Sequence, residues 1–74
     1  MDKATRLQDI VDEAENGTLS SAVRRKGFAA HLARELGLWE PQVQSFLGEM
    51  SGLNFYRVED RRAFVDFFHL AFAL

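Results

Sequence analysis

Apolar residues recur three and four positions apart along most of the chain, the spacing that places them on one face of an α-helix. The clearest stripes are Leu7, Ile10, Val11 and Ala14, and then Val43, Phe46, Leu47 and Met50. No stretch alternates apolar and polar residues as a half-buried strand does. The sequence therefore predicts an all-α fold, a small bundle of four to five helices without a sheet.

The chain has only 74 residues and contains no cysteine. A chain of this length holds a single hydrophobic core, which stabilises the fold only marginally. Without cysteine, neither a disulfide nor a thiolate metal site can add to that core. We therefore expect residues 1–74 to form one domain that depends on its own packing or on a partner.

Capping residues mark the ends of the first helical segments. Asp2 can cap a helix over residues 3–15, and Asn16-Gly17 can close its end. The next helical segment covers residues 19–36 and contains Gly27. The periodicity allows either one helix here or two helices around this glycine.

Two further helices are predicted in the C-terminal half. Pro41 suits the first turn of a helix over about residues 40–50. The last helix begins near Val58 and runs to the C-terminus. In the loop between them, Phe55 and Tyr56 are expected to fold back onto the core.

The segment from Ala29 to Leu47 has the pattern that two short helices need when they cross steeply through a tight turn. Ala33 has to be small where the second helix passes over it, and Gly37 can adopt the backbone of the turn. Four apolar residues fill the wedge between the helices: Leu36, Leu38, Val43 and Phe46. In these features residues 19–50 resemble helix-turn-helix regulators, chiefly Cro-like and phage-repressor-like proteins.

The resemblance implies a small transcriptional regulator that binds double-stranded DNA as a dimer, with the helix over residues 40–50 in the major groove. Base contacts would come from Gln42, Gln44 and Ser45, because glutamine pairs well with adenine and serine is permissive. Contacts to phosphate require cations. The candidates are Arg24, Arg25, Lys26, Arg34 and Arg57.

The charge of the chain favours a different partner. Its formal net charge is −2, whereas a DNA-binding domain normally has a basic face. The predicted recognition helix is atypical, since Trp39 and Glu40 stand where such regulators have a Ser or Thr cap and a glutamine. Trp39 is either an anchor for a protein interface or a lid on the core. The alternative function is therefore a phage or bacterial helix-turn-helix adaptor or inhibitor that acts by protein–protein contact.

The predicted C-terminal helix is apolar on almost every side. Phe64, Phe68 and Phe72 form one stripe. If that stripe faces the core, a second stripe of Phe67, Leu70 and Leu74 faces outward. The sequence favours a homodimer through this outer stripe. The alternative is a central helix that the other helices surround.

The sequence contains no pattern of catalytic, metal-binding or membrane-spanning residues. His31 and His69 lie on different predicted helices and in no metal-binding spacing. A domain of this size rarely encloses a substrate pocket. We therefore expect no enzymatic activity, no cofactor, no metal and no small-molecule substrate. We also expect a cytoplasmic protein without a membrane partner, because no run reaches about 18 apolar residues and the start lacks a signal-peptide core.

Overall fold

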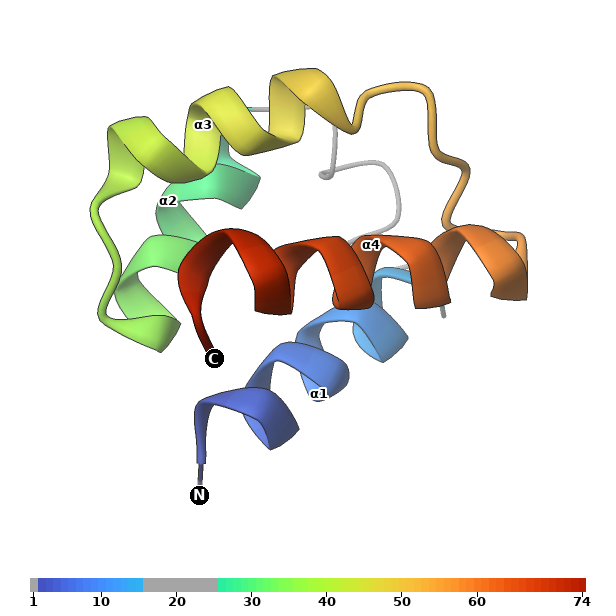
Figure 1. The fold of residues 1–74 in the computed structure, drawn as a ribbon, viewed down its shortest axis with the longest axis horizontal. Helices are drawn as coiled ribbons and strands as arrows, with labels where there is room; N and C mark the ends of the chain where they lie inside the picture. Colours follow the sequence, from blue (N-terminus) through green and yellow to red (C-terminus); the bar gives the residue numbers. More distant parts are fainter. Residues whose placement is uncertain (1, 16–25) are drawn as a thin grey trace.

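The described part of the chain consists of four α-helices and the turns that join them (Figure 1). The computed structural model describes residues 2–15 and 26–74, except for the side chain of Lys26. The helices are α1 (Lys3–Glu15), α2 (Lys26–Leu36), α3 (Glu40–Glu49) and α4 (Val58–Phe72). No described residue lies in a strand, and the all-α prediction is confirmed.

The first helix begins at Lys3 and the second ends at Leu36, as the sequence predicts. Asp2 caps α1, because its Oδ1 accepts a hydrogen bond from the backbone N–H of Thr5 at 2.7 Å. This hydrogen bond lowers the pKa of the Asp2 carboxyl below its usual value. Gly27 lies in the first turn of α2 and does not interrupt the described helix. The predicted end at Asn16-Gly17 and residues 19–25 lie outside the described residues.

A tight turn between α2 and α3 follows the sequence prediction. Gly37 has a φ of +66°, in the left-handed region that favours glycine. The N–H of Leu38 donates to the carbonyl oxygen of Ala33 at 2.9 Å and closes the end of α2. Trp39 occupies the N-cap of α3 without a side-chain hydrogen bond there, and Pro41 lies in the first turn.

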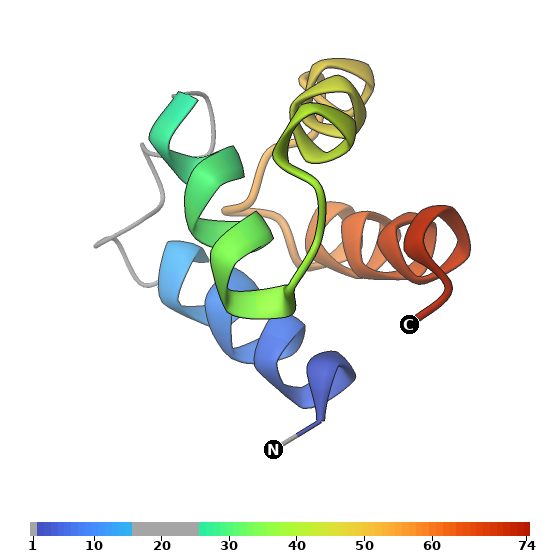
Figure 2. The ribbon, with the colours of Figure 1, turned by 90° about the vertical axis from the view of Figure 1, so that its left-hand side faces the viewer.

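One hydrophobic cluster joins all four helices. Its buried members are Leu7, Ile10, Val11, Ala14, Phe28, Ala29, Leu32, Ala33, Leu36, Val43, Phe46, Phe55, Phe64 and Phe68. The closest helix packing is between α2 and α3, and α1 packs on both α2 and α4. Figure 2 shows α1 and α2 on one side of the molecule and α4 on the other, with α3 running across one end. No described helix has the length and apolar character needed to cross a membrane.

The loop between α3 and α4 confirms only half of its prediction. Phe55 is buried, with 4% of its surface exposed, whereas Tyr56 is 69% exposed. The carbonyl oxygen of Phe55 accepts a hydrogen bond from Nη1 of Arg61 at 2.6 Å. Asn54 Oδ1 accepts one from the N–H of Tyr56 at 3.0 Å. These bonds fix a turn that buries one aromatic ring and leaves the next outside, so the prediction that Tyr56 folds onto the core is wrong.

The end of α4 corrects a second prediction. The helix ends at Phe72 because Ala73 adopts a left-handed backbone with a φ of 54°. The N–H of Leu74 then donates to the carbonyl oxygen of His69 at 3.3 Å. This reversal of the chain packs Leu74 against the core, partly buried. Leu74 therefore does not belong to an outer stripe.

Candidate functional site

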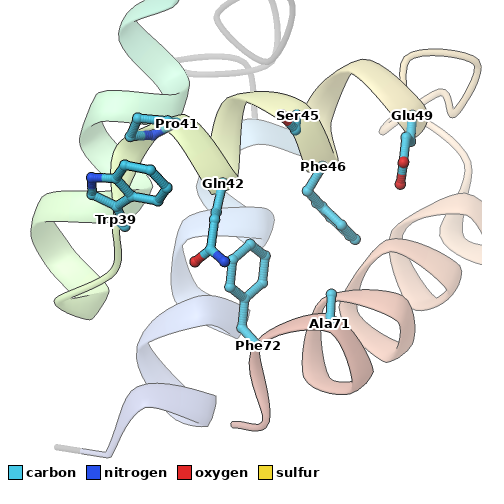
Figure 3. Close-up of a pocket in the computed structure, with 8 residues that line it drawn as sticks. All are labelled: Trp39, Pro41, Gln42, Ser45, Phe46, Glu49, Ala71 and Phe72. Carbon is cyan, nitrogen blue, oxygen red and sulfur yellow. The ribbon is translucent and has the colours of Figure 1, made fainter.

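A groove lies between α3 and the C-terminal part of α4 (Figure 3). Its volume is about 330 Å³, and it is open to solvent. Most of the lining comes from α3 and the residue before it, and two lining residues come from α4. The lining consists of Trp39, Pro41, Gln42, Ser45, Phe46, Glu49, Ala71 and Phe72.

Phenylalanine rings form the floor of the groove. The ring of Phe46 on α3 makes edge-to-face contacts with Phe64, Phe68 and Phe72, at centroid separations of 5.4, 5.2 and 5.7 Å. Helices α3 and α4 run in opposite directions across Figure 1, but the close helix packing lies elsewhere. The rings therefore bridge two helices whose backbones stay apart, and the groove follows that seam.

The outer face of α4 continues the apolar lining of the groove. Phe67, Leu70 and Ala71 lie at i, i+3 and i+4 and therefore share one face of the helix. Ala71 also lines the groove. Phe67 is 48% exposed and Leu70 is 81% exposed. The groove residues together with Phe67 and Leu70 form the α3–α4 surface.

Trp39 stands at the N-terminal end of this surface. Its side chain is 68% exposed, and it lies beside Pro41 at the start of α3 (Figure 3). A side chain this exposed does not cover the core, so the lid, one of the two alternatives for Trp39, does not hold. Tryptophan is favoured at the buried centres of protein interfaces, and its position beside an apolar groove suits such a role.

Glu49 gives the opposite end of the groove a negative charge. It lies in the last turn of α3, where the carbonyl groups already carry partial negative charge. Its carboxylate points from α3 toward α4 (Figure 3). No Lys or Arg is among the lining residues, and Glu49 forms no ion pair with a described residue. The groove is thus apolar at one end and acidic at the other.

The residues predicted to read bases do not share one face of α3. Gln42 and Ser45 line the groove. Gln44 lies nearly opposite Gln42, because two residues correspond to about 200° of helix rotation. Its Nε2 donates to Oε2 of Glu40 at 3.1 Å. The structure therefore brings two of the three side chains together and separates the third.

Of the predicted phosphate contacts, the structure describes Arg34 and Arg57, and neither belongs to α3. Arg34 is exposed on α2. Arg57 occupies the N-cap of α4, where it pairs with Glu59 at 3.5 Å. Arg24, Arg25 and the side chain of Lys26 lie outside the described residues. Neither of the two described candidates lines the groove.

The groove itself was not predicted from the sequence. The spacing of Gln42, Phe46 and Glu49 at i, i+4 and i+7 was a signal that these side chains share one face. That this face meets Ala71 and Phe72 depends on the antiparallel placement of α3 and α4, which no local pattern encodes. The three proposed interface residues on α4 also separate, since Leu74 turns inward while Phe67 and Leu70 stay exposed.

Comparisons with family models, with curated proteins and with solved structures find no match to this chain. Among the described residues, no group of three His, Asp or Glu side chains is placed to hold a metal ion. What the protein binds therefore has to be inferred from its own surface.

Proposed function

We propose that this protein is a small binding module that attaches to another protein through the α3–α4 surface. The observation that carries the proposal is the exposure of Trp39 in the groove and of Phe67 and Leu70 on the face of α4 that they share with the lining residue Ala71. Burying one large apolar side chain contributes about 1.5–3 kcal/mol. Three such side chains around one groove can supply the centre of a protein interface. This is the adaptor or inhibitor function that the sequence offered as its alternative.

A DNA-binding transcriptional regulator is the second candidate, and one observation favours it. The left-handed backbone of Gly37 and the burial of Ala33 and Val43 give α2 and α3 a turn and a packing that suit a helix-turn-helix. Against it stands the electrostatics of α3, which contains two Glu residues and no Lys or Arg. Phosphate contacts supply most of the affinity of such proteins for DNA, so we rank this function second.

The homodimer expected from the sequence would use the outer face of α4. A stable interface buries roughly 800 Å² on each partner. Phe67 and Leu70 alone supply less than that, because Leu74 is turned inward. Sedimentation velocity tests this state, and we expect a monomer at high micromolar concentration. A dimer that Phe67→Glu with Leu70→Glu separates would assign the surface to a second copy of the chain.

Selection from a display library of helical peptides tests the proposed function directly. The wild-type protein is the target, and the Phe67→Glu, Leu70→Glu double variant is the matched control. We expect selected peptides to bind the wild type at least about tenfold more tightly than the variant, a difference of about 1.4 kcal/mol. Selection from random DNA duplexes at low salt runs in parallel. Enrichment of a preferred duplex, without any peptide that discriminates the two proteins, would reverse the order of the two candidates.

A further inference from the structure

We infer that the segment bound by the α3–α4 surface is a basic amphipathic α-helix of the partner protein. This inference rests on the proposed function, because it assigns an occupant to the same surface. The partner helix would place apolar side chains against Phe46 and Phe72, and a lysine or arginine beside Glu49.

The length and walls of the groove suit a helix. α3 has 10 residues, and at 1.5 Å per residue such a helix is about 15 Å long. A partner helix that lies along the groove therefore covers it with about three turns. An amphipathic helix lays the apolar residues at i, i+3 or i+4, and i+7 into such a groove. Phe46 and Phe72 on the floor and Trp39 at the end offer apolar contacts at this scale.

The charge of the groove selects a basic helix over an acidic one. Glu49 lies in the last turn of α3, so its carboxylate and the C-terminal carbonyl groups make the same end of the helix negative. A cation placed there interacts favourably with both. Since Trp39 and Glu49 mark opposite ends of α3, the basic residue of the partner should lie about ten positions along the chain from its first apolar anchor.

A second copy of this chain is a poorer occupant of the groove. The chain has a formal net charge of −2, and like charges brought together across an interface disfavour binding. In a twofold dimer built on the groove, two Glu49 carboxylates would enter one interface without a lining cation from either copy. Charge complementarity therefore points to a different, basic partner.

Two synthetic peptides test the inference. Both are stapled helices of about twelve residues with leucine at i, i+4 and i+7, and they differ only in carrying arginine or glutamate at the polar positions. The chain contains a single Trp, so the fluorescence of Trp39 reports binding without a label. We expect the basic peptide to shift Trp39 emission to shorter wavelength and to bind about tenfold more tightly than the acidic one at low salt.

Two substitutions test whether the basic peptide pairs with Glu49 or responds only to the net charge of the protein. They are Glu49→Gln and Glu13→Gln. Both substitutions change the net charge equally, but Glu13 is exposed on α1 and outside the groove. Glu49→Gln should weaken the basic peptide about three- to fivefold, the range of an exposed ion pair, and Glu13→Gln should leave its affinity unchanged.

Each other outcome has a distinct meaning. Equal binding of the two peptides, or equal effects of the two substitutions, would overturn the basic helix and leave the proposed function standing. If neither peptide binds at about millimolar concentration, the groove does not accept a helix, and display selection decides whether the proposed function also fails. A protein that proves dimeric through this surface would replace the basic helix with a second copy.

Discussion

The two apolar stripes of α4 have opposite surroundings. Phe64 and Phe68 on the inner stripe are 1% and 0% exposed, whereas Phe67 and Leu70 on the outer stripe are 48% and 81% exposed. Residue type and helical spacing are similar in both stripes. The difference comes from the neighbouring elements, since the ring of Phe46 covers the inner stripe from α3. A helix with more apolar surface than its own fold can cover thus has one face in the core and one face exposed to solvent.

Adjacent phenylalanines on α4 give the largest contrast. Phe68→Ala removes a ring that is fully buried against Phe46 and Phe64. It should lower the free energy of unfolding by about 3–5 kcal/mol. Phe67→Ala should change it by less than about 1 kcal/mol, because the ring is half exposed. Urea unfolding followed by circular dichroism measures both. Equal losses would mean that the outer stripe is covered in solution.

The same substitution at two alanines compares the close packing of α2 on α3 with the open groove between α3 and α4. Ala33 is 5% exposed in α2, which packs closely on α3. Ala33→Leu should therefore cost about 1–3 kcal/mol through overpacking. Ala71 is exposed and lines the groove, so Ala71→Leu should change stability by less than about 0.5 kcal/mol. Thermal unfolding of the two variants compares the same substitution in two helices. A large loss for Ala71→Leu would show that the groove is already filled in solution.

Two glycines extend the comparison from side chains to the backbone. At Gly37 an added Cβ would meet only Nζ of Lys3 at 3.8 Å, so space does not exclude a side chain. The φ of +66° does exclude a side chain. Gly37→Val should therefore lower the free energy of unfolding by about 1–3 kcal/mol. Gly48 lies in α3 with no atom within 4 Å of an added Cβ. Gly48→Ala should stabilise the protein by about 0.5–1 kcal/mol, because alanine favours the helix. In chemical unfolding, we expect the two substitutions to change the free energy of unfolding in opposite directions. Changes in the same direction would contradict the positive φ of Gly37.

Patterns over a few neighbouring residues predicted the features that interactions between those residues determine. The apolar stripes placed the helices, and Gly37 marked the turn because few other residues tolerate a positive φ. Spacing placed Phe64 and Phe68 on one stripe of α4, and the structure shows that this stripe is the buried one. The reversal at Ala73 could not be predicted, since alanine disfavours a left-handed backbone and carries no stop signal.

The candidate site was harder to predict from the sequence than the fold. Trp39, Phe67 and Leu70 were recognised as surplus apolar surface, and all three are exposed. The groove beside them depends on how far apart the rings of Phe46 and Phe72 hold α3 and α4. That spacing is a tertiary property of residues 26 positions apart, and no pattern within either helix reports it.

The smallest predicted effect concerns the carboxylate of Glu35, far weaker than the apolar contacts compared above. Glu35 of α2 pairs with Arg6 of α1, with Oε1 3.3 Å from Nη2. The hydrogen bond from Arg6 lowers the pKa of Glu35 below its usual value of 4.5. Because the pKa of Glu35 is lower in the folded state than in the unfolded state, the pair stabilises the fold at pH values above the usual glutamate pKa. This stabilisation is lost as the pH falls through the pKa of the folded state. The effect is small, since solvent reaches both side chains.

Unfolding at a series of pH values from neutral to about pH 3 tests this sign. Glu35→Gln should flatten the loss of stability below the usual glutamate pKa, because the variant has no carboxylate to protonate at that pair. Arg6→Gln removes the other member of the pair and should flatten the same part of the curve, because Arg6 is the main cause of the lowered pKa of Glu35. If the curves of both variants matched that of the wild type, this pair would contribute nothing to the acid dependence.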